Sequence, residues 1–471
     1  MACATALSIP CCWADTPLPD VFGTASNVLA VTAIPLLGGG ACHALPETRP
    51  LELDEVILQA ICANPVARRA WADARAQAAA LGVADAAYLP TLNATVGVER
   101  NTNSTTYDGS ALGESSTRES QKSRGRSAML EASWVLFDFG RRSAIRQQAL
   151  ALLAAANASH DEALQTAFFT AAQAFYALRE AQASLDAAQR TEVIAHTSLA
   201  EAEAKHDAGA GTLADELQAR TSYRRAVLDR VGADGDMQAA TGALAVAIGL
   251  DANAPVRIAF ADSGTDSPYD VEAGIDQLID EARRRHPKLA AARAQLDAAR
   301  ANVEAVRGLG YPTVSLVGSL WQNNPKYQQP DPASITRSRG STIGLQVTIP
   351  LFEGFASGYR VRQAEAQVDA QGAVLRDIEL QLSLDVWKGY QGVQTCTANL
   401  ANSRALLDDG QRALDVARAR YKQGVGTLAD LLAAQAALAD AQKQRVLAVS
   451  KWQTARLKLA TSLGKLNLWR E

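Results

Sequence analysis

The sequence has no excess of positive charge. Its 46 basic and 50 acidic residues are spread over 471 positions and leave a net charge of -4. Nucleic-acid-binding proteins usually carry a basic face, so we expect no nucleic-acid partner. The chain also lacks an apolar run of the roughly 18 to 20 residues that a membrane-spanning helix needs. A helical membrane protein is therefore excluded.

Metal-binding and catalytic patterns are also missing. The six cysteines and five histidines show no CxxC, HxxxH or HExxH spacing, so no zinc site is predicted. Neither a nucleophile motif nor a phosphate-binding GxxxxGK[ST] loop is present. We expect no cofactor, no metal and no enzymatic activity.

Aromatic residues are scarce, at 6% of the chain, and the hydrophobic share is carried by Ala, Leu and Val among helix-favouring Gln, Arg and Glu. Proline, which breaks helices, is absent between Pro90 and Pro255 and after Pro350. Residues 141–208 also lack glycine, which predicts a helix of roughly 100 Å. Residues 357–423 carry Gly372, Gly389, Gly392 and Gly410, each costing about 1 kcal/mol in a helix interior. We expect this second long helix to be less regular.

A tandem duplication runs through the chain. Two landmarks recur 222 positions later and two more recur 215 positions later. The pairs are Pro65 with Pro287, Pro90 with Pro312, Leu136-Phe137-Asp138 with Leu351-Phe352-Glu353, and 209–215 with 424–430. Constant offsets indicate a repeated unit. The seven-residue difference predicts a shorter loop between the paired strands of the second half.

The two repeats are predicted at 45–250 and 271–471, joined by a linker at 251–270. Each contains a helix, two strands, a very long helix and a return helix. The predicted ranges are 65–87, 91–99, 127–137, 141–208 and 213–248 in the first repeat, and 287–308, 313–321, 341–350, 357–423 and 428–463 in the second.

Residues 1–44 are predicted to be a signal peptide or a disordered leader. An apolar run at Val28–Leu37 and small residues up to Ala44 fit a secretory signal cut near Ala44. The usual basic segment before the apolar run is missing, since the first basic residue is Arg49. Cleavage after Ala14 and lipidation at Cys42 remain alternatives.

The four predicted strands alternate apolar and polar side chains. Their length of nine or ten residues fits tilted strands of a membrane barrel, although a small soluble sheet alternates in the same way. The polar segments 100–126 and 322–340 are predicted to be loops outside the membrane. Four strands cannot close a barrel, and an open edge in lipid leaves backbone groups unsatisfied. A barrel therefore requires two or three chains.

This order of elements, duplicated once, resembles the TolC-like outer membrane factors over residues 50–465. The most specific segment is Arg420–Leu432, RYKQGVGTLADLL, which is similar to the family's RYxxGxxxxxDLL segment. Tyr88-Leu89-Pro90 and LFDFG at 136–140 support the resemblance. It implies a mainly α fold with a β-barrel: a homotrimer whose twelve strands form a transmembrane barrel in the outer membrane. The long antiparallel helices would form a coiled-coil tunnel in the periplasm.

The resemblance also implies roles for particular residues. The turn residues would dock a periplasmic adaptor at the tunnel tip: Gly209, Ala210, Gly211, Thr212, Gly424, Val425, Gly426 and Thr427. Asp215, Tyr421 and Asp430 would lie at the closed entrance. The junction between barrel and helices would be formed by Phe137, Asp138, Gly140, Phe352, Glu353 and Gly354.

Helix capping offers a second explanation for the two acids. Thr212 with Asp215, and Thr427 with Asp430, each match the [ST]-x-x-[DE] pattern that satisfies backbone N–H groups at a helix start. A ring of three like-charged carboxylates in a narrow pore would instead attract cations. Both roles can coexist.

The predicted function is a passive outer-membrane channel of a tripartite export system. The implied partners are the periplasmic adaptor, an inner-membrane ABC exporter or proton-driven pump, and outer-membrane lipid. Within the family, the chain resembles components of toxin secretion, which implies type I secretion of a protein. The alternatives are a small-molecule efflux duct of the same architecture and a soluble coiled-coil scaffold with a small β cap.

Overall fold

The computed structural model describes residues 20–28, 49–108, 113, 115–259, 274–327 and 337–464. The predicted cleavage and lipidation positions Ala14, Cys42 and Ala44 lie outside the described residues. The described chain divides into two compact units. The sheet unit comprises residues 20–27, 76–153 and 295–371, and the helical unit comprises most of the remainder.

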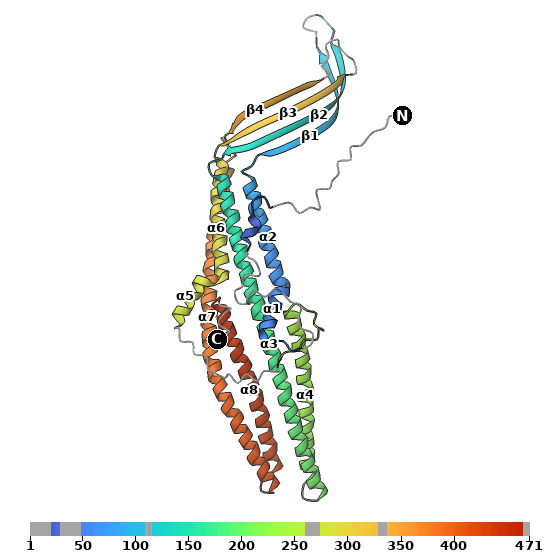
Figure 1. Cartoon of the computed structure of the whole chain (residues 1–471), viewed down its shortest axis with the longest axis vertical. Coiled ribbons are helices and arrows are strands. Elements are labelled where there is room, and N and C mark those ends of the chain that lie inside the picture. Colours follow the sequence, from blue (N-terminus) through green and yellow to red (C-terminus); the bar gives the residue numbers. More distant parts are fainter. Residues whose placement is uncertain are drawn as a thin grey trace, which may run out of the picture. The chain divides into compact units, whose positions relative to one another are not determined.

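The sheet unit contains one four-stranded antiparallel sheet in the order β1-β2-β3-β4 (Figure 1). The strands are β1 (Thr91–Tyr107), β2 (Thr117–Phe137), β3 (Thr313–Tyr327) and β4 (Ser338–Thr348). Each strand pairs only with its neighbours along the chain, so β1 and β4 are the two edges. This sheet and the long helices confirm the predicted mainly α class with four strands per chain.

One face of the sheet is apolar near the helices. The register places Leu130 opposite Leu320 and Leu316 opposite Leu345, so their side chains share a face with Val96 and Ile343. The other face carries mainly small and polar residues, such as Asn93, Ser133, Ser319 and Thr342.

The paired strands continue well beyond the predicted boundaries, so the loop predictions at 100–126 and 322–340 were wrong over much of their length. The β1–β2 ladder extends to Tyr107 opposite Thr117, and β3 extends to Tyr327. Alternating hydropathy marks where a strand meets an apolar medium, whereas backbone pairing continues through the Thr, Ser and Asn residues beyond it.

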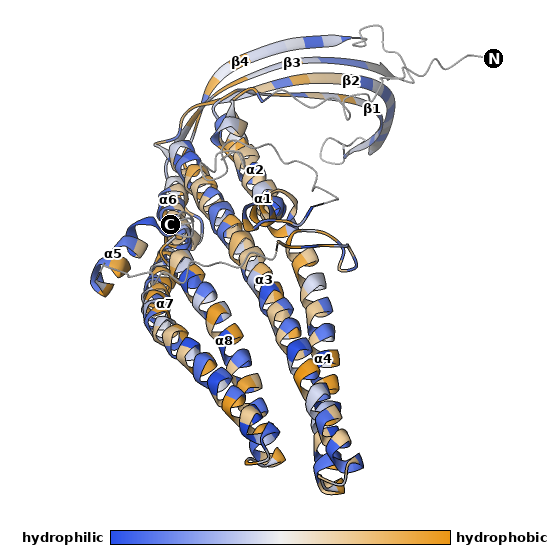
Figure 2. Cartoon of the chain, turned by 60° about the horizontal axis from the view of Figure 1, so that its bottom comes forward, coloured by the Kyte–Doolittle hydropathy of each residue, from blue (hydrophilic) through white to orange (hydrophobic). Residues whose placement is uncertain are grey.

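Eight α-helices are found in the described residues. They are α1 (Leu53–Ala63), α2 (Pro65–Ala86), α3 (Arg141–Asp207), α4 (Leu213–Ala247), α5 (Ile275–Arg285), α6 (Pro287–Arg307), α7 (Ala356–Lys422) and α8 (Leu428–Ser462). The starts and ends of α3 and α4 are each 215 positions before those of α7 and α8, so the duplication extends to whole helices. In the helical unit, α3 lies beside α4 and α7 lies beside α8 (Figures 1 and 2).

The short helices α1 and α5 were not predicted. They start 222 positions apart, at Leu53 and Ile275. The proline landmarks have the same offset, so a comparison of the two repeats at this spacing could have predicted both helices. Each contributes to an apolar core cluster: Val56 and Ala60 pack with Leu178 and Leu244, and the equivalent Leu278 packs with Val393 and Leu459. The two clusters are duplicates of each other.

The beginning of the predicted linker also belongs to the first core cluster. Val256 and Ile258 are buried there with Leu51. The Leu51 N–H donates to the Arg257 carbonyl at 2.8 Å, and the Ala259 N–H donates to the Leu51 carbonyl at 3.0 Å. Residues 256–259 are therefore part of the packed helical unit and not a free connection.

The prediction that α7 would be less regular than α3 was wrong, because both are continuous helices of 67 residues. Two of the glycines in α7 have packing reasons. A Cβ on Gly389 would lie 3.3 Å from the Leu459 Cα, and one on Gly410 would lie 3.5 Å from the Ala441 Cβ. These glycines let α8 approach closely, which offsets their low helix propensity.

Apolar and polar residues alternate along every long helix, as Figure 2 shows. None of the described helices is both long and apolar enough to cross a membrane.

Candidate functional site

The predicted tip consists of two turns with the same hydrogen-bond pattern. In the first, Ala210 N–H and Gly211 N–H both donate to the Lys205 carbonyl, at 2.8 and 2.9 Å. In the second, Val425 N–H and Gly426 N–H donate to the Arg420 carbonyl, at 3.0 and 3.1 Å. Each turn reverses direction at a glycine with positive φ, 68° at Gly209 and 72° at Gly424. These positions favour glycine because a Cβ is strained there.

Both capping boxes are formed. Asp215 N–H donates to the Thr212 hydroxyl at 3.1 Å, and Thr212 N–H donates back to the Asp215 carboxylate at 3.3 Å. The second box matches it, with 3.1 Å from Asp430 N–H to the Thr427 hydroxyl and 3.2 Å in return. The two acids therefore have a structural role at the first turns of α4 and α8, whatever else they do.

Tyr421 joins the two helical hairpins, α3–α4 and α7–α8, near their turns. Its side chain is buried among Leu199, Ala202, Leu428 and others of one apolar cluster. The Lys205 Nζ lies 3.5 Å from the centre of the Tyr421 ring and donates to the Tyr421 carbonyl at 3.0 Å. Burial raises the pKa of Tyr421, and the negative charges of Asp215 and Glu201 raise it further.

Ionic contacts also join α3 to α7 here. The Glu201 carboxylate lies 3.7 Å from both the Arg418 guanidinium and the Lys422 ammonium. Deeper in the bundle, the Gln435 amide donates to the Ser198 hydroxyl at 2.5 Å. Within one chain, these ion pairs and the hydrogen bond connect the two hairpins close to their turns.

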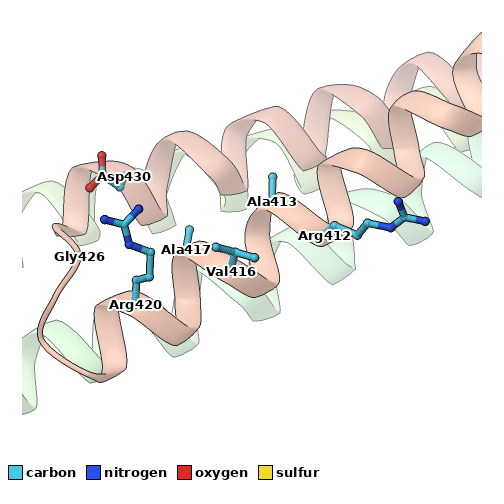
Figure 3. Close-up of a pocket in the computed structure, with 7 residues that line it drawn as sticks. All are labelled: Arg412, Ala413, Val416, Ala417, Arg420, Gly426 and Asp430. Atoms are coloured by element: carbon cyan, nitrogen blue, oxygen red, sulfur yellow. The ribbon is translucent and has the colours of Figure 1, made fainter.

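The two predicted entrance acids have different surroundings. Asp215 is half-buried and close enough to Tyr421 to affect its pKa, whereas Asp430 is exposed. The Thr427 hydroxyl and backbone N–H lower the pKa of Asp430, and the positive charge of Arg420 lowers it further. Figure 3 shows Arg420 and Asp430 on the two sides of the Gly426 turn, at the end of a groove of about 450 Å³. Arg412 and Val416 continue this groove along α7.

The predicted junction centres on Asp138, which is buried and caps α3. Its carboxylate accepts from Arg142 N–H at 3.0 Å and from the Arg142 Nε at 2.9 Å. The same guanidinium donates to the carbonyls of Val135 at 2.6 Å and Ala87 at 3.3 Å, and lies over the Tyr88 ring. Arg142 therefore ties the end of β2 to the end of α2. No sequence pattern singled it out.

The junction of the second repeat is built differently. Glu353, which is equivalent to Asp138, is exposed and accepts from Arg360 at 2.8 Å. The sharp bends lie at Phe139 and Gly140 in the first repeat, and at Gly354 and Phe355 in the second, all with positive φ. Phe352 and Phe355 form an edge-to-face pair with ring centres 5.4 Å apart.

Exposed aromatic side chains gather at these junctions. Phe137 packs edge-on against Phe139, whose ring centre lies 6.0 Å from that of Tyr311. All three rings are about half exposed, and Phe352 and Phe355 are more exposed still. Such rings at the helical end of an apolar strand surface match the aromatic girdle of membrane barrels.

No group of His, Cys, Asp and Glu side chains that could hold a metal ion occurs among the described residues.

Comparison with known proteins gives consistent results for sequence and structure. The model of the family described as Outer membrane efflux protein matches residues 56–250 and 278–465. The chain is 31% identical over 417 residues to protein CyaE of Bordetella pertussis, covering 88% of this chain and 84% of that protein. It is 27% identical over 422 residues to the pyoverdine export outer membrane protein OpmQ of Pseudomonas aeruginosa, with coverages of 88% and 84%. Among solved structures, the outer membrane protein VceC of Vibrio cholerae superposes with a TM-score of 0.72 at 20% identity, covering 88% of this chain and 96% of that one.

Proposed function

Because the chain belongs to the outer membrane efflux protein family, we propose that three copies of it form one export channel with a barrel in the outer membrane and a helical tunnel in the periplasm. Family membership makes the chain an outer-membrane channel protein and not an enzyme. It also excludes the alternative of a soluble coiled-coil scaffold.

The observation that carries this proposal is the open sheet. Both β1 and β4 have an unpaired edge, and Val96, Val98 and Ile343 on its apolar face are each at least 80% exposed. Such a face is stable in lipid, but unpaired backbone groups there cost several kcal/mol each. Pairing β4 of one copy with β1 of the next removes both edges.

The helices support the same assembly. Apolar side chains on α4 follow a helical stripe and are about half exposed or more: Leu213, Leu217, Leu228 and Val231. A stripe at this spacing is typical of a helix that packs against another helix. In the trimer, this stripe would pack against the hairpin of a neighbouring copy.

The two turns at the ends of the hairpins are the proposed docking site for a periplasmic adaptor. Their backbones are rigidly defined by the hydrogen bonds and capping boxes, while Ala210 and Val425 are exposed. The glycines in each turn let the backbone of another protein approach closely.

Charged substitutions at the turns test this docking. Ala210→Arg and Val425→Arg avoid the positive-φ glycines, so the turns should keep their shape. We expect export in cells to fall by at least about tenfold while the trimer still assembles, because a buried unpaired charge costs several kcal/mol at an interface. The control is Gln189→Arg, at an exposed position within α3 and away from the turns. Unchanged export with both turn variants would refute the docking assignment.

For the cargo, we propose a protein toxin delivered by an ABC exporter, as in type I secretion. The support is the resemblance to toxin-secretion components together with 31% identity to CyaE, which exceeds the 27% identity to OpmQ. OpmQ, named for pyoverdine export, supports small-molecule efflux as the second candidate.

An export assay decides between these cargoes. A strain that lacks its own outer-membrane channel would receive this chain with either an ABC exporter and its protein substrate or a proton-driven pump. Restored secretion of the protein supports the first proposal. Restored resistance to small toxic molecules, without protein secretion, supports the second.

A further inference from the structure

Positive and negative side chains are fully separated on the two faces of the sheet. Besides Lys326, the register puts six basic residues on the same face as the apolar side chains, beyond them toward the strand ends at Tyr107, Thr117, Tyr327 and Ser338. We call this set the basic belt; it consists of Arg100, Arg118, Lys122, Arg124, Arg126 and Arg339. Glu99 and Glu131 lie on the opposite face.

The belt is not neutralised within the described part of the chain. All six side chains are exposed, and none forms an ion pair with a described acid. Arg118 donates to the Ser104 hydroxyl at 2.9 Å, which leaves its charge uncompensated. Arg100 and Arg124 face each other directly across β1 and β2. Like charges at such a position destabilise a sheet, so an external anion is expected to compensate them.

The location of the belt indicates the source of that anion. The apolar face begins near the junction aromatics, runs from Leu92 to Val98 on β1, and ends where Arg100 and Arg126 begin. Seven residues of strand span about 20 Å, close to the height of a lipid-facing band once the neighbouring strands are included. The belt therefore lies at the membrane surface that is farther from the helices.

We propose that the basic belt binds the phosphate groups of an anionic glycolipid of the lipid A type in the outer leaflet. Guanidinium groups bind phosphate through paired charge-assisted hydrogen bonds, and five of the six side chains are arginines. In a trimer the belt encircles the barrel and presents three copies of each cation to the headgroups. This inference rests on the proposed trimer and on its orientation, with the strand turns toward the cell exterior.

The first test compares lipid A carrying two, one or no phosphates, added to the purified wild-type trimer in a neutral detergent. Bound lipid is counted by native mass spectrometry. We expect affinity to fall at least about tenfold for each phosphate removed, and to fall further as salt is added. Equal binding of the three forms would overturn the proposal. Phosphatidylglycerol serves as a second anionic lipid, and equal affinity for it would show a general anionic surface and refute the glycolipid assignment.

The second test uses the variant Arg100→Gln/Arg124→Gln/Arg126→Gln. The matched control is Arg225→Gln/Lys388→Gln/Arg404→Gln, which removes three exposed cations from α4 and α7. Only the belt variant should lose binding of diphosphoryl lipid A, by at least about tenfold. Equal loss in both variants, or none in either, would refute the belt as the site. If the belt variant does not assemble, the wild-type phosphate series still decides the question.

Trimer formation and export are measured on the same wild-type preparation and strain. A wild-type chain that does not form trimers would contradict the proposed function. A trimer that exports normally but does not discriminate lipid phosphates would contradict only the inference about the belt.

Discussion

Arg142 is the side chain whose removal should damage the fold most at the junction. Its side chain is largely buried beside Asp138, and Arg142→Ala would leave that carboxylate without its cation and three carbonyls without their donor. Breaking one partner of a buried pair costs roughly 3 to 5 kcal/mol. We expect a loss of this size in denaturant unfolding of the trimer in detergent.

The duplication supplies a control for this prediction. Arg360 pairs with Glu353 at the equivalent junction, but both side chains are well exposed. An exposed pair contributes about 0 to 1 kcal/mol, so Arg360→Ala should have little effect. If the two alanine variants lose the same stability, the Arg142–Asp138 pair does not stabilise the fold more than the exposed Arg360–Glu353 pair does.

His286 should make the stability of the helical unit depend on pH. Its Nδ1 accepts a hydrogen bond from Lys288 N–H at 3.2 Å, as the Asn64 side chain does from Val66 N–H in the first repeat. Burial lowers the pKa of His286, Lys288 lowers it further, and Asp385 opposes this. Between the lowered pKa and the ordinary value of about 6.5, only the unfolded chain takes up the proton.

Stability from His286 is therefore fully present above about pH 6.5 and falls as the pH decreases through the folded-state pKa. His286→Asn, which copies the first repeat, should flatten the pH dependence of unfolding over this range. His196→Asn, at an exposed position, serves as the comparison. If His286→Asn leaves the slope of the unfolding free energy against pH unchanged, the His286 ring does not cause the pH dependence.

The capping boxes at the starts of α4 and α8 allow capping to be separated from gating. Thr212→Ala and Thr427→Ala remove a cap acceptor and should each cost about 1 kcal/mol. Asp215→Asn and Asp430→Asn keep an oxygen acceptor but remove the charge. If the acids form a cation-attracting ring, the Asn variants should lose cation selectivity in single-channel recordings with little change in stability. Unchanged selectivity would leave capping as their role.

The long helices could be predicted to within a residue or two because proline, glycine and Thr-x-x-Asp caps mark their ends locally. The structure begins α4 at Leu213 and α8 at Leu428, directly after Thr212 and Thr427. Strand ends have no such markers. The ladder between Arg100 and Tyr107 was missed because its backbone pairing does not depend on apolar alternation.

The candidate site was predictable only where it is local in sequence. The turn glycines and capping acids fall within one short motif. The contact between Lys205 and Tyr421 joins residues 216 positions apart, and Arg142 bonds to the Ala87 carbonyl 55 positions away. Neither pair shows a pattern that a single sequence could reveal, since both depend on how the hairpins and the sheet pack.

One chain cannot close a barrel by itself, so closure requires several copies. Cysteines placed on the apolar faces of the two edge strands test it: Val96→Cys on β1 combined in turn with Ser341→Cys, Ile343→Cys or Leu345→Cys on β4. A disulfide needs Cα atoms about 4.4 to 6.8 Å apart, so only the pair in register should link. The native cysteines alone provide the background.

We expect one of the three combinations to give covalent dimers and trimers on denaturing gels after mild oxidation of membranes. Four strands are too few to curl onto themselves, because even the smallest membrane barrels use about eight. Links formed only within one chain would show that β1 and β4 of the same copy meet. That result would remove the reason for a trimer, since the apolar face and the strand edges would then be completed without a partner.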